Sequence, residues 1–219
     1  FSAIGSPLLG KNSIYEAGTS LLIDGPVGNL EIECTGNRGQ ETSVILCHPH
    51  PSYGGSMDDL VLAEASGCCQ KLGISHVRFN FRGVGASEGR HDSSDAEHNG
   101  EVEDLKAVLS WMRTEFRAER VIGIGYSFGS FIINRGDQLN LFNKSILIAP
   151  PNVSMSFIFD NPQQLSDIIY GEKDTYIDPR KFPSHAKLRV KTVKDGDHFF
   201  YGSYGDLSAQ IMSSLTEEY

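Results

Sequence analysis

Short apolar stretches alternate with helical patterns along most of this chain, and this alternation limits the fold more than any other feature. Apolar runs predict strands at 43–48, 76–81, 120–124, 143–149, 164–170 and 188–193. Apolar spacing of three and four residues predicts helices near 59–72, at 100–116, from about 127 and at about 204–217. Because parallel strands need a crossover connection, usually a helix, the sequence predicts an α/β fold with a mainly parallel central sheet and helices on both faces.

The first part of the chain has a different pattern. Residues 18–23 and 30–35 are predicted strands on either side of a turn at Gly25-Pro26, which is typical of an antiparallel pair. The chain has 219 residues and no internal repeat or long linker. An α/β pattern of this length favours a single domain, which we expect over residues 1–219.

Charge and apolar run length exclude several function classes. Nineteen Lys and Arg against 28 Asp and Glu give a net charge of −9, which repels phosphate backbones, so no nucleic-acid partner is expected. The apolar runs are too short to span a bilayer, so no membrane association is expected either. Residues 1–5 lack the pattern of a signal peptide. Four cysteines without a paired spacing indicate reduced thiols, and the expected location is cytoplasmic (Cys34, Cys47, Cys68 and Cys69).

A candidate nucleophile lies between a predicted strand and a predicted helix. Residues 125–129 read G-x-S-x-G, with Ser127 at the centre. A sharp strand-to-helix turn exposes such a serine hydroxyl, and glycine at both flanking positions avoids crowding in the turn. The N–H of Phe128 would then face a developing oxyanion at the positive end of the helix dipole. The alternative is a glycine-rich turn needed only for close packing.

A serine nucleophile needs a base and an acid from later strand ends, in the order Ser, Asp or Glu, His. Asp174 follows the strand predicted at 164–170, and His198 follows the strand predicted at 188–193. We predict that His198 takes the proton of Ser127 and that Asp174 orients the imidazole.

Three other residues compete for these roles, and a fourth lies close by. Glu172 and Asp178 are rival acids by position, and His185 is the rival base. His185 precedes its strand, so it is expected at the opposite edge of the sheet. Asp197 is interpreted as a residue that shapes its loop.

The loop at 48–57 is expected to supply the second oxyanion donor as a backbone N–H. Pro49 and Pro51 lack this group, so the nearest donors along the chain are Ser52 and Tyr53. The same loop permits another interpretation, in which His48 and His50 lie on one face of a strand and bind a metal. We favour a structural role for these histidines and predict no metal ligands.

Five ordered motifs together resemble those of the α/β-hydrolase superfamily, and more narrowly its small lidless serine hydrolases related to dienelactone hydrolase. The resemblance implies carboxylesterase-type chemistry on a small acyl substrate, without a cofactor. Dienelactone hydrolases have a cysteine nucleophile where this chain has Ser127, so their substrate specificity is not expected here. The motifs are HPHPSYGGSM (48–57), RFNFRGVGASEG (78–89), GIGYSFGS (123–130), GEKD (171–174) and GDHFF (196–200).

The connection at 150–163 is too short for a helical lid, which predicts an open site. We predict that Phe157, Phe159 and Phe200 line an acyl pocket near the nucleophile, together with Tyr53 and Phe128. The alternative is that the segment 155–159 packs on the sheet or forms a dimer contact. The sequence does not distinguish a monomer from a homodimer.

The first functional hypothesis is a serine hydrolase that cleaves small esters through an acyl-enzyme. A thioesterase or an acyl-peptide hydrolase with the same residues is the enzymatic alternative. The others are a catalytically silent binding protein and a metal-dependent hydrolase. The stretch 78–89 is interpreted as scaffold, in which Arg82 ties its loop to neighbouring carboxylates.

Overall fold

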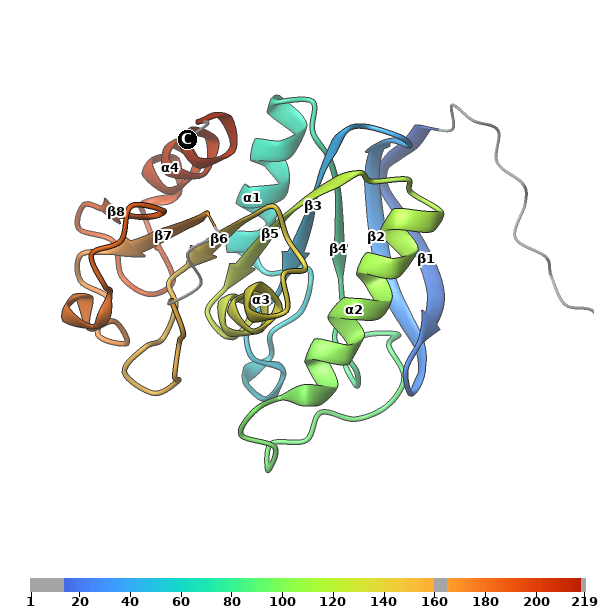
Figure 1. Cartoon of the computed structure of the whole chain (residues 1–219), viewed down its shortest axis with the longest axis horizontal. Helices are drawn as coiled ribbons and strands as arrows, with labels where there is room; N and C mark the ends of the chain where they lie inside the picture. Colours follow the sequence, from blue (N-terminus) through green and yellow to red (C-terminus); the bar gives the residue numbers. More distant parts are fainter. Residues whose placement is uncertain (1–13, 160–164, 218–219) are drawn as a thin grey trace, which may run out of the picture.

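The computed structural model describes residues 14–159 and 165–217 (Figure 1). Its strands are β1 (Ile14–Gly25), β2 (Gly28–Asn37), β3 (Thr42–Cys47), β4 (Ser75–Phe79), β5 (Arg120–Tyr126), β6 (Lys144–Ile148), β7 (Ser166–Gly171) and β8 (Leu188–Val193). Its α-helices are α1 (Leu60–Lys71), α2 (Asn99–Thr114), α3 (Phe128–Gln138) and α4 (Tyr204–Thr216). Two short 3-10 helices are η1 (Pro51–Tyr53) and η2 (Pro179–Lys181).

Within the described ranges, these strands form one eight-stranded sheet in the order β1-β2-β4-β3-β5-β6-β7-β8. Neighbours from β4 to β8 run parallel, whereas β2 is antiparallel to both β1 and β4. The connection from β3 to β4 and the connection from β4 to β5 lead in opposite directions across the sheet. The sheet therefore has a topological switch point beside β3 and β5, where open α/β sheets bind ligands.

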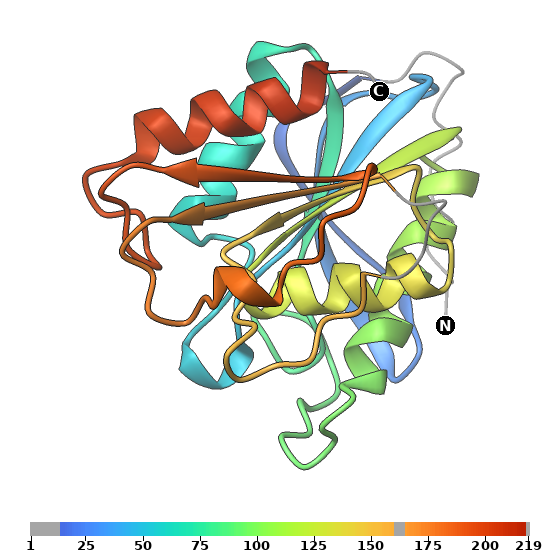
Figure 2. The same ribbon diagram turned by 60° about the vertical axis from the view of Figure 1, so that its left-hand side comes forward.

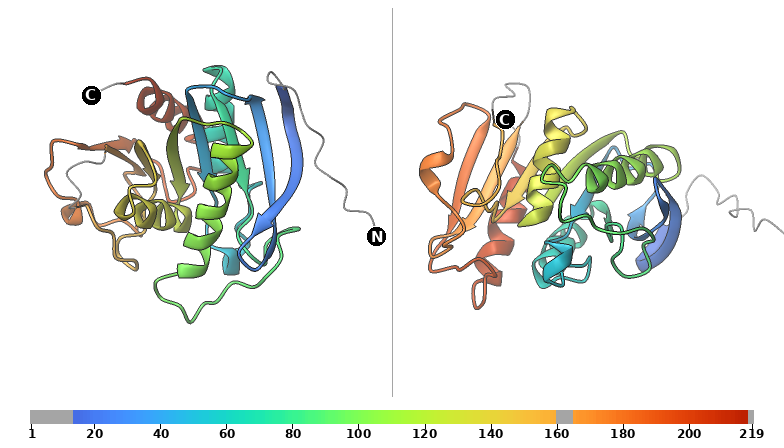
Figure 3. Two further views of the ribbon diagram at one scale, coloured as in Figure 1. Left: turned by 45° about the vertical axis from the view of Figure 1, so that its right-hand side comes forward. Right: turned by 90° about the horizontal axis from the view of Figure 1, so that it is seen from below.

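Helices cover both faces of the sheet. Figure 2 shows α1 and α4 on one face and α3 on the other, and Figure 3 places α2 on the same side as α3. Right-handed crossovers explain the placement of α1, α2 and α3, because connections that lead in opposite directions place their helices on opposite faces. The last helix, α4, follows β8 and packs beside α1. Each face encloses its own apolar cluster, with Leu105 and Ile133 in one and Leu62 and Ile211 in the other.

The fold class predicted from the sequence is confirmed, including the mainly parallel sheet and the antiparallel N-terminal pair. The turn predicted at Gly25-Pro26 is the hairpin itself, since Gly25 pairs with Gly28. The element bounds differ from the predictions by a few residues at most ends, and neither 3-10 helix was expected. The N-terminal residues 1–5 and Gln164, at the start of one predicted strand, lie outside the described residues.

The stretch 78–89 has the scaffold role expected from the sequence. The Arg82 guanidinium donates to both carboxylate oxygens of the fully buried Asp104, at 2.7 Å for the shortest contact. The same stretch is bonded to β2, with the N–H of Glu88 donating to the carbonyl of Asn29 at 2.8 Å. These contacts hold the end of β4 and the start of α2 beside the carboxyl edge of the sheet.

The four cysteine thiols are buried and form no disulfide. Burial raises the pKa of Cys34 and of Cys69 to about 12, which keeps both thiols protonated and poorly reactive at neutral pH. In the described ranges, every helix is too short or too polar to cross a bilayer.

Candidate active site

Ser127 occupies a strained turn between β5 and α3. Its backbone has φ 52° and ψ −115°, a conformation that L-residues rarely adopt and that costs roughly 1–3 kcal/mol. A Cβ atom on Gly125 would lie 2.2 Å from the carbonyl oxygen of Gly129, and one on Gly129 would lie 2.0 Å from that of Cys47. The two glycines therefore permit the close approach of helix and strands that the turn requires, which is the steric reason predicted from the sequence.

The three residues predicted as nucleophile, base and acid lie in one hydrogen-bonded chain. The Ser127 Oγ is 3.0 Å from His198 Nε2, and His198 Nδ1 is 2.7 Å from Asp174 Oδ2. The Asp174 carboxylate is fully buried, and its Oδ1 accepts the N–H of Tyr176 at 2.8 Å. A proton on Nδ1, shared with the carboxylate, leaves Nε2 as the acceptor that faces the serine hydroxyl.

Backbone contacts fix the loop that carries His198. The buried Tyr126 hydroxyl donates to the carbonyl of His198 at 3.1 Å. The Asp197 carboxylate accepts the N–H groups of Phe199 and Tyr201 at 3.0 and 3.2 Å. Asp197 thus shapes the loop, as interpreted from the sequence, and the imidazole is held between Ser127 and Asp174.

The other rival residues have separate partners. Asp178 is bound to Arg180 and caps η2, and Glu172 is exposed and accepts the N–H of Asp195. His185 lies near the start of β8, where its Nδ1 accepts the N–H of Lys187. The structure brings none of these three side chains to Ser127.

The loop after β3 corrects the expected second oxyanion donor. The N–H of Ser52 donates to the His50 side chain at 3.1 Å, and the N–H of Tyr53 donates to the His50 carbonyl at 3.1 Å. Both predicted donors are therefore committed to the turn that forms η1. Pro49 and Pro51 have no N–H, which leaves the N–H of His50 as the group without an acceptor among residues 49–53 of the described loop.

His48 is a structural residue and is not available to a metal. It is fully buried, its Nδ1 lies 2.6 Å from the carbonyl of Pro49, and its Nε2 accepts the N–H of Phe81 at 3.0 Å. Burial lowers the pKa of His48 to about 4, which keeps the ring neutral. With both ring nitrogens in use, a metal site built from His48 and His50 does not fit the structure.

Two of the three predicted pocket residues line a common cavity, and the third does not. Phe200 is fully buried in the apolar cluster under α4, where its ring packs with the core and faces no open pocket, so its prediction as a pocket residue is wrong. Phe157 and Phe159 line a cavity of about 210 Å³ together with Asn152 and Lys181. Neither Ser127 nor His198 lines this cavity.

Sequence reasoning missed two aromatic residues beside the base. The Tyr176 ring lies 4.6 Å from the His198 ring, and the Phe199 ring lies 5.4 Å from it. Both side chains are about half exposed, so they form an apolar rim next to the imidazole. Phe199 directly follows the base in the chain, which is a local signal, whereas only the fold brings Tyr176 to this place.

Comparisons with known proteins agree with this geometry. An α/β serine hydrolase homologue from Coxiella burnetii is 30% identical, with a TM-score of 0.78 over 93% of this chain and 100% of that chain. An α/β serine hydrolase without a lid from Xanthomonas campestris is 30% identical, with a TM-score of 0.79 over 93% of this chain and 96% of that one. An uncharacterized protein of Rickettsia prowazekii, RP471, is 29% identical over 89% of this chain and 87% of its own length.

More distant structures share the fold alone. The Pyrococcus furiosus esterase Pf2001 is 17% identical, with a TM-score of 0.70 over 92% of each chain. No protein-family model matches this chain. The fold, the strained serine turn and the two full-length serine hydrolase relatives at 30% identity lead to one assignment. This chain belongs to the α/β-hydrolase superfamily, among its lidless serine hydrolases.

Proposed function

We propose that this protein is a carboxylesterase-type serine hydrolase that cleaves small acyl esters through an acyl-enzyme on Ser127. The observation that carries the proposal is the hydrogen-bonded chain from Ser127 Oγ through the His198 imidazole to the Asp174 carboxylate, at 3.0 and 2.7 Å. A hydroxyl becomes an effective nucleophile when an adjacent base takes its proton, and the base is effective when a third group orients it.

The proposed reaction has two halves. His198 Nε2 takes the proton as Ser127 Oγ attacks the acyl carbon, and it then protonates the alcohol that leaves. Water attacks the acyl-enzyme in the second half, with the same nitrogen as base, and Ser127 regains its proton when the acid departs. The buried Asp174 stays ionised and stabilises the imidazolium in both halves.

The proposed oxyanion donors are the backbone N–H groups of Phe128 and His50. Phe128 is the first residue of α3, so its N–H has no acceptor within the helix. The His50 and Phe128 rings lie 4.8 Å apart, which places the two residues side by side across the switch point. Loss of one such donor typically lowers the rate by about 100- to 1000-fold.

The proposed substrate is a small acyl ester with an apolar part. Tyr176 and Phe199 offer an exposed aromatic surface beside the base. Phe157 and Phe159, in the connection between β6 and β7, offer two aromatic rings to a cavity that polar side chains also line. We propose this cavity as the acyl pocket. Phe157→Ala and Phe159→Ala should then shift the chain-length preference among acyl esters, and an unchanged preference in both variants contradicts this assignment.

The decisive experiment is labelling with a fluorophosphonate, measured by intact mass. Wild-type protein should gain a single adduct, Ser127→Ala should gain none, and His198→Ala should react far more slowly. Ser154→Ala is the matched control, because this serine is exposed on a nearby loop and should leave labelling unchanged. Folded wild-type protein without an adduct would favour a silent binding protein instead.

A panel of matched ester, thioester and amide substrates separates the enzymatic alternatives. The proposal expects the highest kcat/KM on the ester. A thioesterase or an acyl-peptide hydrolase would use the same three residues, so the labelling result would be the same and only the panel distinguishes them.

A further inference from the structure

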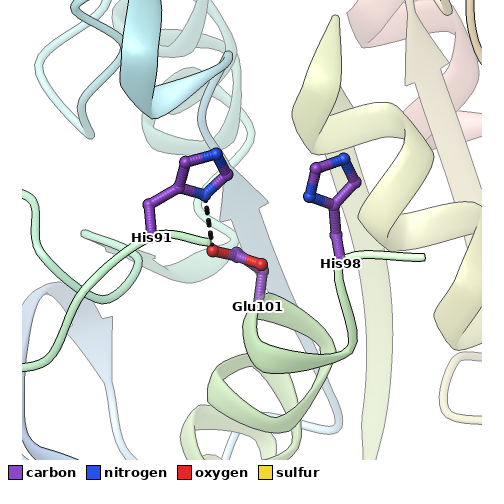
Figure 4. A group of neighbouring side chains, drawn as sticks. All are labelled: His91, His98 and Glu101. Carbon is purple, nitrogen blue, oxygen red and sulfur yellow. Dashed lines mark hydrogen bonds and ion pairs between the residues drawn. The ribbon is translucent and has the colours of Figure 1, made fainter. Parts of the chain in front are cut away.

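A second cluster of chemically active side chains lies between the end of β4 and the start of α2. His91 belongs to the loop before α2, His98 is the residue that precedes the helix, and Glu101 lies in the first helical turn. Figure 4 shows the Glu101 carboxylate close to the His91 ring, with the His98 ring facing them from the other side. One ligand atom from each residue lies within 4.8 Å of the others.

The hydrogen bonding of this cluster is incomplete. His91 Nδ1 lies 2.7 Å from Glu101 Oε1, but His91 Nε2 and His98 Nδ1 are buried without a hydrogen-bond partner. His98 is only 7% exposed and Glu101 only 2% exposed. Because buried imidazole nitrogens are normally hydrogen-bonded or bound to a metal, the orphan Nδ1 of the buried His98, which faces the Glu101 carboxylate, points to a ligand.

We propose that His91, His98 and Glu101 bind one divalent transition-metal ion, and that zinc is the ion this ligand set suits best. Two imidazoles and one carboxylate are a common set of protein ligands for Zn²⁺, with a fourth position left for water. Metal–ligand bonds of about 2.0–2.2 Å place tetrahedral ligand atoms about 3.3–3.6 Å apart. The cluster therefore needs a contraction of roughly 1–1.5 Å at its widest separation, which side-chain rotation and the loop that carries His91 can supply.

The neighbouring His50 is not a fourth ligand. Its ring lies 5.0 Å from the His91 ring and 6.0 Å from the His98 ring. However, His50 Nδ1 accepts the N–H of Ser52 at 3.1 Å, so in the neutral ring the proton is on Nε2 and no lone pair faces a metal. The proposed site therefore has three protein ligands.

The charges around the cluster are compatible with a cation. Arg82 interacts electrostatically with Glu101, but its guanidinium is bound to the carboxylate of the fully buried Asp104. Asp92 and Asp95, in the loop between the two histidines, add negative charge at the surface. These carboxylates, together with Glu101, would favour a bound cation.

The proposed site adjoins the nucleophile turn. The His98 ring contacts Phe128 at 4.8 Å and Phe131 at 5.9 Å, both of which belong to the start of α3. Metal binding would tie the loop at 91–98 to the first turn of α2 and thereby fix the wall behind Phe128. The bound metal would be structural and would take no part in the hydrolysis.

Zinc titration against a chromophoric chelator tests the proposal without an activity measurement. Metal-free wild-type protein should bind one zinc ion, and His98→Gln and Glu101→Gln should each weaken binding by about 100-fold or more, beyond the usual effect of outer-shell residues. His185→Gln and His198→Gln are the controls and should bind zinc as wild type does. Equal affinity in wild type and His98→Gln, or loss of the site in His198→Gln, would overturn the assignment.

A second measurement needs no ligand variant and so covers the case in which such variants fail to fold. Cobalt(II) bound to two imidazoles and a carboxylate with few waters should give intense visible ligand-field bands, which zinc then abolishes by displacement. Cobalt should also raise the Tm of the wild-type protein, because a ligand that binds only the folded state stabilises it. A weak spectrum like that of hydrated cobalt, with no shift in Tm, contradicts the proposal.

Discussion

At the scale of single residues, the candidate site depends on a buried acid that has few other partners. The Asp174 side chain has no exposed surface, and among the described residues its hydrogen-bond partners are the imidazole of His198 and the N–H of Tyr176. An orienting role for Asp174 therefore predicts a large kinetic effect from a small chemical change, because the carboxylate sets which ring nitrogen carries the proton.

Asp174→Asn should lower kcat on a model ester by about 10⁴-fold, since an amide favours the wrong imidazole tautomer. Asp178→Asn is the control and should remain near the wild-type rate, because its carboxylate is bound to Arg180. Steady-state kinetics on both variants shows which of the two aspartates orients the imidazole. An active Asp174→Asn beside an inactive Asp178→Asn would assign the acid to the other loop.

A second buried carboxylate makes the stability depend on pH. Burial raises the pKa of Asp137 to about 7, and its Oδ2 accepts the Ser145 hydroxyl at 2.7 Å. The folded-state pKa lies above the unfolded value, so the folded protein binds more protons between about pH 4 and pH 7. Stability therefore falls as the pH rises through this window.

Asp137→Asn should remove this loss and raise stability at pH 8 relative to wild type, on the order of 1–4 kcal/mol. Urea unfolding at pH 5 and pH 8 measures the effect. Asp24→Asn, at an exposed position on β1, is the control and should leave the pH dependence as it is. A wild-type protein equally stable at both pH values would contradict the argument.

At the scale of elements, the nucleophile turn depends on how closely α3 approaches the sheet. The N-terminus of the helix lies against the end of β3, and only glycine fits at the two flanking positions. The motif could be identified from the sequence because its requirement is local: a strand, a sharp turn and a helix within a few residues. The loop at 48–55 could not, because its donors depend on the turn that forms η1.

Gly129→Ala should destabilise the protein by about 1–3 kcal/mol and abolish fluorophosphonate labelling, because the added Cβ would lie 2.0 Å from the carbonyl oxygen of Cys47. Gly205→Ala is the matched control. Its Cβ would meet no atom within 4 Å at the start of α4, so the change should be neutral or stabilise by up to about 1 kcal/mol. Thermal unfolding and intact-mass labelling of both variants test the prediction, which fails if Gly129→Ala still labels.

At the scale of the whole molecule, the sheet separates two apolar clusters. Leu105 of α2 is fully buried in one of them, and Ile211 of α4 is fully buried in the other. Side chains on opposite faces of a sheet share no contacts, so their contributions to the free energy of unfolding should be independent.

Leu105→Ala and Ile211→Ala should each destabilise the protein by about 2–5 kcal/mol. The double variant should lose the sum of the two within about 0.5 kcal/mol. Denaturant unfolding of the three variants provides the comparison. A coupling well above that value would show that the faces communicate through the sheet.

The sequence by itself determined the fold class and the order Ser127, Asp174, His198, because periodicity and turn chemistry are properties of neighbouring residues. Tertiary structure decided what depends on distant segments. It brought Tyr176 to the rim of the site, turned Phe200 into the core and placed the N–H groups of Ser52 and Tyr53 within η1. It also brought His91, His98 and Glu101 into a cluster behind Phe128. The physical reason is that a side chain's partners across a fold depend on crossover direction and backbone dihedrals, which no local pattern records.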